Sequence, residues 1–262
     1  MSENIIYCYS GSGNCLSMAR KIAEELGSTD IVLMRKKPAV MDATAYKRVG
    51  FVFPCHGGGL PGDTEYFIRN IRYSLGSYKF AVVQYAGYMG CGLSKIDELV
   101  AGGLDYWDGI PQHCSAIWLM PHWLTLSPKS LKLSQKASDS KAKRVAKDVK
   151  EMKKSAKNPP KGYLFRMESK GFGNINKLVN SKLNVNDKCV GCGKCAAVCA
   201  KDNISIVNGK AVIGKNCVGC MSCVEYCPSE AINVGTITVK RARYHNARIS
   251  VDDLNEKIIT VK

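Results

Sequence analysis

The sequence predicts two modules in one chain: an open, doubly wound parallel α/β sheet, followed by a small, cysteine-rich α+β module. Two observations lead to this prediction. In the first half, short apolar runs alternate with segments of helical spacing, and in the last third eight of the 13 cysteines fall into two runs. With 262 residues, 45% of them hydrophobic, the chain is long enough to bury one large core or two smaller ones.

Five short apolar runs predict the strands of the sheet. They span residues 5–9, 31–34, 49–53, 80–84 and 116–119. Apolar residues at helical spacing predict helices over 16–26, near 63–74 and near 92–101. Strands that alternate with helices form a parallel sheet, and the ligand of such a sheet lies beyond the carboxyl ends of its strands.

A loop of small residues connects the first strand to the first helix. This segment, which we call the phosphate loop, consists of Ser10, Gly11, Ser12, Gly13, Asn14 and Cys15. Glycines let the backbone approach an anion, and the N–H groups at a helix N-terminus face it, so the loop predicts a phosphate site. It lacks the lysine of a Walker A loop, and its length does not fit the G-x-G-x-x-G loop of dinucleotide-binding folds.

Eight cysteines form two runs of identical C-x2-C-x2-C-x3-C spacing that begin 28 residues apart. The runs are Cys189, Cys192, Cys195 and Cys199, then Cys217, Cys220, Cys223 and Cys227. Thiolates at this spacing wrap around an iron–sulfur cubane. Buried free thiols and zinc are the alternatives, but zinc ribbons usually pair C-x2-C knuckles instead. Between the runs, Asn208-Gly209 predicts a β-hairpin turn.

The formal net charge of +16 is concentrated in the middle of the chain. Residues 129–182 carry 16 basic and 4 acidic side chains, whereas residues 1–128 carry 11 of each. Such a block attracts nucleic acid or an acidic protein partner, but Lys-rich helical faces are often merely solvated. We expect a Lys-covered helix over 129–158 and a second helix near 172–183.

Neither a membrane span nor an exported, disulfide-bonded protein is expected. The sequence has no run of about 18 apolar residues, and its first residues lack the basic-then-apolar layout of a signal peptide. We therefore expect a cytoplasmic protein. An odd number of cysteines in a long chain favours metal or redox chemistry over disulfide bonds.

Over residues 185–235 the chain resembles the two-cluster bacterial ferredoxins, in which the fourth cysteine of each run ligates the other cluster. The resemblance implies two 4Fe-4S clusters. One would be held by Cys189, Cys192, Cys195 and Cys227, and the other by Cys217, Cys220, Cys223 and Cys199. Ala200 stands where the family often has proline, as it does at Pro228.

Over about residues 3–128 the chain resembles flavodoxins, whose phosphate loop reads S/T-x-S/T-G-N-S/T; Cys15 replaces the last hydroxyl. The resemblance implies FMN, with its isoalloxazine ring between two later loops, the ring loops 54–61 and 85–92. Their candidate binding residues are Pro54, Cys55, His56, Gly57, Gly58, Tyr85, Ala86, Gly87, Tyr88 and Gly92. Tyr85 or Tyr88 would stack on the ring, and His56 is either a flavin neighbour or an ordinary loop histidine.

Together the two halves resemble the flavodoxin-ferredoxin fusion proteins of anaerobes. Met120-Pro121, Cys227-Pro228 and the tail Arg243-Tyr244-His245 add to the resemblance, while Trp123 stands where the family commonly has asparagine. We expect a flavodoxin-like domain over 1–158, a linker and helix over 159–184, and a two-4Fe-4S ferredoxin-like domain with a tail over 185–262.

These cofactors predict an electron-transfer protein, because a 4Fe-4S cluster passes one electron at a time and a flavin accepts one or two. An acidic ferredoxin, flavodoxin or oxidoreductase is the expected partner. The alternative is an enzyme, an FMN-dependent reductase that receives electrons through its own clusters. It would reduce a small organic acceptor bound beside His56 or the aromatic segment 118–123, which contains Trp118, His122 and Trp123. Nucleic-acid binding rests on charge alone. A homodimer, and the roles of Cys8, Cys55, Cys91 and Cys114, stay open.

Overall fold

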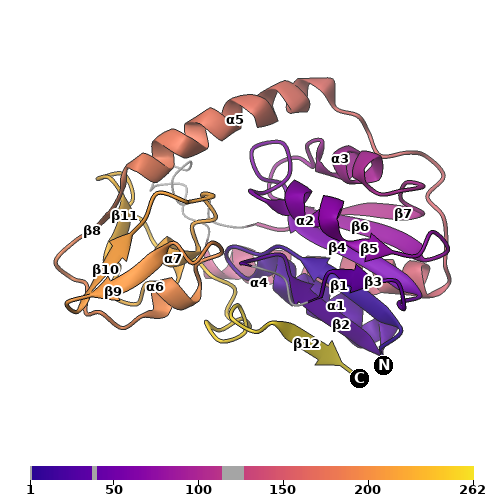
Figure 1. Cartoon of the computed structure of the whole chain (residues 1–262), viewed down its shortest axis with the longest axis horizontal. Helices are drawn as coiled ribbons and strands as arrows, with labels where there is room; N and C mark the ends of the chain where they lie inside the picture. The colour runs from indigo at the N-terminus through magenta and orange to yellow at the C-terminus, as the bar shows by residue number, and fades with distance from the viewer. Residues whose placement is uncertain (1, 37–39, 114–126) are drawn as a thin grey trace.

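The computed structural model describes residues 2–36, 40–113 and 127–262. Within these ranges the chain forms a larger lobe around one six-stranded sheet and a smaller lobe of short strands and helices (Figure 1). The N- and C-termini lie close together at the edge of the larger lobe (Figure 1).

The larger lobe is built on a sheet with the strand order β12-β2-β1-β4-β6-β7. Its strands are β1 (Asn4–Cys8), β2 (Thr29–Leu33), β4 (Arg48–Pro54), β6 (Tyr78–Tyr85), β7 (Tyr106–Pro111) and β12 (Ile258–Val261). The first five are parallel, and β12 pairs antiparallel with β2. The order of the parallel strands is the flavodoxin-like one, which confirms the predicted doubly wound sheet.

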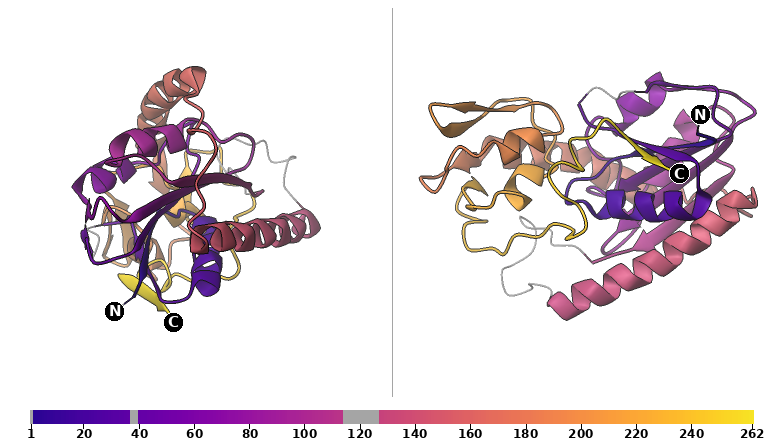
Figure 2. Two further views of the ribbon diagram at one scale, coloured as in Figure 1. Left: turned by 90° about the vertical axis from the view of Figure 1, so that its right-hand side faces the viewer. Right: turned by 90° about the horizontal axis from the view of Figure 1, so that it is seen from below.

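Helices cover both faces of this sheet (Figure 2). On one face α1 (Asn14–Leu26) and α4 (Pro128–Lys150) share a core that includes Leu16, Ile22 and Val145. On the other, α2 (Thr64–Asn70) and α3 (Gly92–Leu99) share a second core. A two-stranded ribbon of β3 (Asp42–Ala43) and β5 (Arg72–Tyr73) lies beside them.

The fifth parallel strand differs from the prediction. It is β7, which the sequence analysis missed because Asp108, Gly109 and Pro111 disfavour strands and leave no apolar run. An edge position tolerates such residues. The expected strand at 116–119 lies outside the described residues.

Two helix boundaries were also predicted wrongly. The Lys-covered helix α4 ends at Lys150, not near 158, because Met152 adopts the left-handed conformation with φ of 53°. The next helix, α5 (Tyr163–Ser181), begins directly after Gly162, which has φ of 52°, rather than near 172.

The smaller lobe contains two short two-stranded sheets and two short helices. Its elements are β8 (Leu183–Val185), α6 (Lys194–Ala197), β9 (Ile204–Val207), β10 (Lys210–Ile213), α7 (Ser222–Glu225) and β11 (Ile232–Val234). The hairpin β9–β10 turns at Asn208 and Gly209, with φ of 48° and 72°, as the sequence predicts. β11 pairs with β8.

Within the described ranges the chain crosses between the lobes twice. It enters the smaller lobe along α5, and the segment 243–262, which we call the tail, returns to the larger lobe and ends as β12. The last strand of the region expected as the second domain therefore belongs to the first sheet. No helix in the described part of the chain is long and apolar enough to cross a membrane.

Candidate functional site: two cysteine sets and a loop cluster at the sheet edge

The eight cysteines of the two runs surround two cavities in the smaller lobe. We call them the first cysteine set, Cys189, Cys192, Cys195 and Cys227, and the second cysteine set, Cys199, Cys217, Cys220 and Cys223. Each set takes three cysteines from one run and the fourth from the other, the same division that the resemblance implies. Their role as ligands stays a prediction.

Backbone N–H groups donate hydrogen bonds to sulfur atoms in both sets. These bonds join Ala211 to Cys189 (3.4 Å), Ala231 to Cys227 (3.2 Å), Asn203 to Cys199 (3.2 Å) and Gly219 to Cys217 (3.4 Å). N–H donors stabilise thiolates and tune the clusters they hold. No His, Cys, Asp or Glu side chains among the described residues form a group of three placed to bind a single metal ion. The thiols surround cavities instead, an arrangement that fits a multi-atom cluster.

Burial acts on the thiols of both sets. It raises the pKa of Cys217 to about 11 and moves the pKa of Cys223 well above its usual value. Burial also raises the pKa of Cys227, but the Ser229 hydroxyl and nearby backbone N–H groups outweigh it and leave that pKa below its usual value. Because a metal deprotonates a coordinating thiol outright, iron would supply the charge state that burial opposes in the second set.

The second cysteine set lies directly against the larger lobe, at the carboxyl ends of its parallel strands. Cys220 packs on the core shared by α2 and α3. Its backbone oxygen lies only 2.6 Å from where a Cβ atom on Gly11 would be, and the Ser222 hydroxyl donates to Gly11 O at 2.9 Å. Glycine is therefore required at position 11 by the contact between the lobes.

Two buried polar side chains mark this contact. Arg35, 5% exposed, donates from Nη1 to Ser10 O at 2.8 Å and from Nη2 to Val198 O, so it joins the phosphate loop to the cysteine run. Tyr9, which directly follows β1, is 3% exposed. Its hydroxyl has no hydrogen-bond partner among the described residues. Burial, with nearby Cys220, raises the pKa of Tyr9. The Tyr9 hydroxyl therefore stays protonated and can donate a hydrogen bond to an acceptor atom at this edge of the sheet.

The tail covers the other side of the phosphate loop. The Asn246 N–H donates to Ser12 O at 2.8 Å. Gly13 has φ of 92°, and a Cβ atom there would lie 2.8 Å from the Tyr226 hydroxyl and 2.9 Å from Ile249 Cβ. The glycines that predicted room for a phosphate thus also make room for the smaller lobe and the tail.

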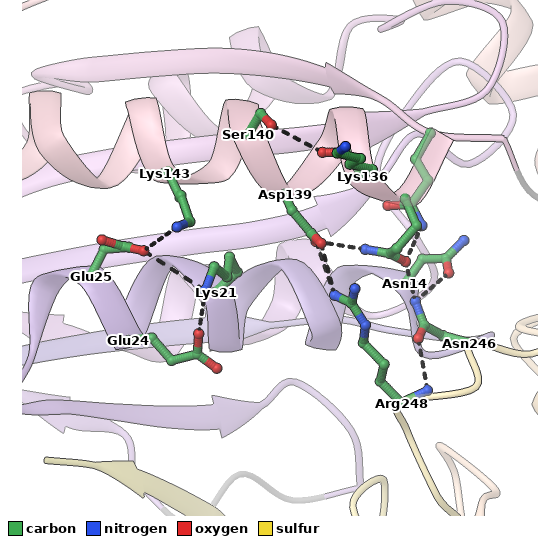
Figure 3. Close-up of polar contacts among 12 residues, drawn as sticks. Asn14, Lys21, Glu24, Glu25, Lys136, Asp139, Ser140, Lys143, Asn246 and Arg248 are labelled. Carbon is green, nitrogen blue, oxygen red and sulfur yellow. Dashed lines mark hydrogen bonds and ion pairs between the residues drawn. The ribbon is translucent and has the colours of Figure 1, made fainter. Parts of the chain in front are cut away.

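Hydrogen bonds and ion pairs connect the tail to α1 and α4 (Figure 3). Asn14 Oδ1 accepts hydrogen bonds from Tyr244 Oη at 2.8 Å and from Asn246 Nδ2 at 3.0 Å. Arg248 forms an ion pair with Asp139 on α4 at 3.0 Å. The network fixes the Asn14 side chain at the start of α1.

The phosphate loop nevertheless keeps donors for an anion. The backbone N–H groups of Gly11, Ser12, Gly13 and Asn14 have no hydrogen-bond partner in the described ranges. Cys15, which replaces the hydroxyl of the flavodoxin pattern, directs its thiol to Gln84 Oε1 on β6 at 3.3 Å. The loop therefore offers a phosphate its backbone amides rather than the Cys15 side chain.

The two ring loops contact each other. His56 and Gly59 exchange two backbone hydrogen bonds of 3.1 Å around Gly57 and Gly58, which have φ of 53° and 73°. The Cys91 N–H then donates to Gly58 O at 2.7 Å. The loops therefore form one surface at the carboxyl ends of β4 and β6, and β4 pairs with β1, the strand that leads into the phosphate loop.

Helix α5 lies on this surface. The Tyr88 ring stacks on Phe165, with ring centroids 4.9 Å apart, and its hydroxyl donates to Glu168. Lys95 Nζ donates to Ser169 Oγ at 3.1 Å. Of the two tyrosines expected to stack on a flavin, Tyr88 therefore already has an aromatic partner, whereas Tyr85 ends β6 and packs on the second core.

The other candidate ring-loop residues occupy varied environments. Pro54 ends β4, Ala86 and Gly87 are exposed, and Gly92 begins α3 against the ring of Phe53. Burial raises the pKa of Cys55 to about 11 and lowers that of His56 to about 4. His56 is thus neutral near pH 7.

Of the thiols with open roles, Cys8 is buried in the sheet, and Cys91 is buried within the ring loop 85–92. Cys114 and the aromatic segment 118–123 lie outside the described residues. The sequence analysis assigned no role in the site to Arg35, Tyr9 or Asn246, and it named Tyr244 only within the tail motif Arg243-Tyr244-His245. Arg35 carries a weak signal, a charge just after a strand. Asn246 carries none, because only the tertiary fold brings it to the loop.

Comparison with known proteins identifies the smaller lobe. Residues 181–246 match the family model of the 4Fe-4S dicluster domain. The search of curated proteins found no match to this chain.

Solved structures resemble the larger lobe only distantly. An azoreductase from Bacillus anthracis str. Sterne is 7% identical, with 56% of this chain and 99% of that one covered and a TM-score of 0.38. An FMN-dependent NADH-azoreductase from Bacillus anthracis str. Ames Ancestor, in complex with FMN, is 13% identical, with 56% and 100% covered and a TM-score of 0.38. Rubredoxin oxygen:oxidoreductase from Desulfovibrio gigas is 14% identical, with 56% and 36% covered and a TM-score of 0.33.

Because these TM-scores are low, the fold of the larger lobe rests on its own strand order. The smaller lobe is an iron–sulfur module, and such modules carry electrons. The chain therefore joins a flavodoxin-like parallel sheet to a 4Fe-4S ferredoxin-like dicluster domain.

Proposed function

We propose that the protein transfers electrons between two 4Fe-4S clusters in the smaller lobe and one FMN at the carboxyl ends of the parallel strands. One observation carries the proposal. The second cysteine set contacts the sheet edge through Cys220, whose backbone oxygen lies 2.6 Å from the Cβ position of Gly11 in the phosphate loop. A cluster on this set would lie beside any ligand of that loop.

The residues at the edge fit FMN in three ways. The unpaired N–H groups of residues 11–14 suit its phosphate. The joined ring loops offer backbone for a planar ring. The buried Tyr9 hydroxyl, which has no hydrogen-bond partner in the described part of the chain, can donate a hydrogen bond to the ligand.

The two kinds of redox group differ in the number of electrons that they accept, which gives a reason for joining the two lobes in one chain. FMN accepts one or two electrons, whereas each cluster passes one at a time. The chain's own residues would hold the groups close together and exclude water: Cys220 and Tyr9 seal the contact between the lobes, and Arg35 places a buried cation there.

Anaerobic purification and cofactor analysis test the proposal. We expect one FMN and about eight irons per chain. A limiting amount of reductant should bleach the absorbance of the clusters and of the flavin together. Zinc in place of iron, or the absence of flavin, would overturn it.

A second function, reduction of a small organic acceptor, is favoured by a polar cavity beside the first cysteine set. Cys227 lines it together with Lys194, Tyr226, Arg243 and His245, whose N–H and O–H groups can donate hydrogen bonds. An acceptor bound there would lie beside the proposed cluster of the first cysteine set and within reach of these hydrogen-bond donors. Rapid anaerobic turnover of small acceptors by the purified protein alone would favour this function over electron carriage.

A further inference from the structure

Helix α5 touches both parts of the proposed electron path. Near its start, Phe165 and Glu168 contact Tyr88 of a ring loop. Near its end, the Asn180 amide donates to Cys217 O at 2.9 Å, and Val179 lies in the core of the smaller lobe. A protein bound to α5 would therefore lie close to both proposed redox centres.

Among the side chains of α5 that the structure describes, those on the opposite face make no such contacts. Four large apolar side chains of this helix are exposed: Tyr163 (72%), Leu164 (81%), Met167 (73%) and Leu178 (58%). Helical spacing places Met167 and Leu178 on the side away from Phe165 and Val179. Met167 lies four residues after Tyr163 and three after Leu164, so these three side chains form an exposed apolar patch at the start of the helix, with Leu178 near its end. An exposed apolar patch of this kind marks an interaction site.

Cations flank the apolar face. Helical spacing places Lys170 and Lys177 on the same side of α5 as Met167. Lys161 and Lys182 lie at the two ends of the helix, and all four lysines are exposed. None of the four forms an ion pair with any residue that the structure describes. By contrast, Lys143 and Lys153 in the α4 region pair with acidic residues.

We propose that the exposed face of α5, which we call the α5 face, docks an acidic redox protein. The inference rests on the proposed function and adds a partner to it. The occupant is chosen by charge complementarity: the holoprotein keeps a net charge of about +10 after the cofactors are counted. An apolar centre with a charged rim is the anatomy of a transient interface. One electron leaves the reduced partner, which is oxidised, and enters this chain, which is reduced; no atom is exchanged.

Two other occupants fit less well. A second copy of this chain would place Lys170 and Lys177 against the same lysines of its partner, and like charges facing each other oppose binding. A membrane surface would use the lysines and apolar residues but would gain nothing from the contact of α5 with both redox sites.

The test measures how fast a reduced, acidic flavodoxin passes electrons to the anaerobic holoprotein at several salt concentrations. Lys170→Glu with Lys177→Glu should slow the second-order rate about tenfold at low salt and flatten its salt dependence. The matched control, Lys132→Glu with Lys147→Glu, makes the same charge change on α4 and should slow it less than about twofold.

A second pair of variants tests the apolar contact. Leu164→Asn should slow the reaction, whereas Leu133→Asn, at a residue 59% exposed on α4, should not. Equal slowing by α5 and α4 variants, or no slowing by either, would overturn the proposal. Two further results would also overturn it. One is a dimer of the unmutated protein that Leu164→Asn abolishes, and the other is binding of the unmutated protein to phosphatidylglycerol vesicles that Leu164→Asn abolishes. Iron and flavin content, measured separately, reports on the proposed function, so the two failures are distinguishable.

Discussion

The two cysteine runs have the same spacing, but the two cysteine sets formed from them lie in opposite surroundings. In the first set Cys192 is exposed, and neighbouring Val190 is 71% exposed. In the second set no cysteine is exposed, and Cys220 packs against the larger lobe. The position of a cysteine set in the fold, and not its sequence motif, therefore decides whether the set faces solvent or the larger lobe.

The turn that precedes each short helix also differs. Gly193 caps α6 with φ of 77°, whereas Met221 caps α7 with φ of 59°. A left-handed methionine is strained, and such strain persists only where packing enforces it. Met221 is buried in the smaller-lobe core, on the side that contacts the sheet edge.

The largest effect is expected from removing one ligand of each set. Cys220→Ala should lose about four of the irons and slow flavin reduction by the clusters about a hundredfold or more. Cys192→Ala should also lose about four irons, yet leave the inward cluster able to exchange electrons with FMN. Iron analysis and anaerobic stopped-flow absorbance measure both.

The opposite ranking would contradict the comparison. If Cys192→Ala stopped flavin reduction while Cys220→Ala left it intact, the first set would be the one beside the flavin.

Gly11→Ala probes the contact of the second set with the sheet edge. The added methyl meets Cys220 O at 2.6 Å, so we expect about 1–3 kcal/mol of destabilisation and slower electron transfer from cluster to flavin. Gly76→Ala is the control, because its nearest neighbour is Ser74 Oγ at 3.8 Å. Urea unfolding of both variants should show a loss for position 11 only; equal stability would mean that the lobes do not touch there.

Asn246→Ala tests whether the tail supports the phosphate loop. It removes side-chain hydrogen bonds to Asn14 and Gln135, and we expect about 1–2 kcal/mol of lost stability and weaker FMN retention. Asn255→Ala removes an exposed contact with Lys36 elsewhere in the tail and serves as the control. Flavin release on dilution measures the effect, and identical release from both variants would contradict it.

The smallest effect concerns His56 in the ring loop 54–61. Burial lowers the pKa of His56 to about 4, below its value of 6.5 in an unfolded chain. As pH falls through 6.5, the unfolded state binds a proton that the folded state does not, so stability decreases. Between pH 7 and 5.5 this costs about 1 kcal/mol. His56→Gln should lose correspondingly less stability over that range in thermal unfolding; an unchanged pH slope would contradict the low pKa.

Much of the fold follows from local sequence. Apolar runs and turn residues predict β1, β2, β4, β6 and the β9–β10 hairpin, because buried parallel strands and Asn-Gly turns leave local signals. β7 escapes such reasoning because Asp108, Gly109 and Pro111 disfavour strands and only the edge position permits them.

The candidate site is predicted only in part, for a different reason. The cysteine runs and the phosphate loop are contiguous, so their spacing is visible in the sequence. Asn246 reaches Ser12 across more than 200 residues, and α5 reaches Tyr88 through packing. No local pattern reports contacts that arise when a tail folds back or a linker helix lies over a loop.

The most direct test of the account is a crystal structure of the anaerobic holoprotein. We predict FMN with its phosphate on the amides of residues 11–14, and the cluster of the second cysteine set as the nearer of two clusters to its ring. A flavin nearest the first set, or a different nucleotide in the phosphate loop, would contradict the account.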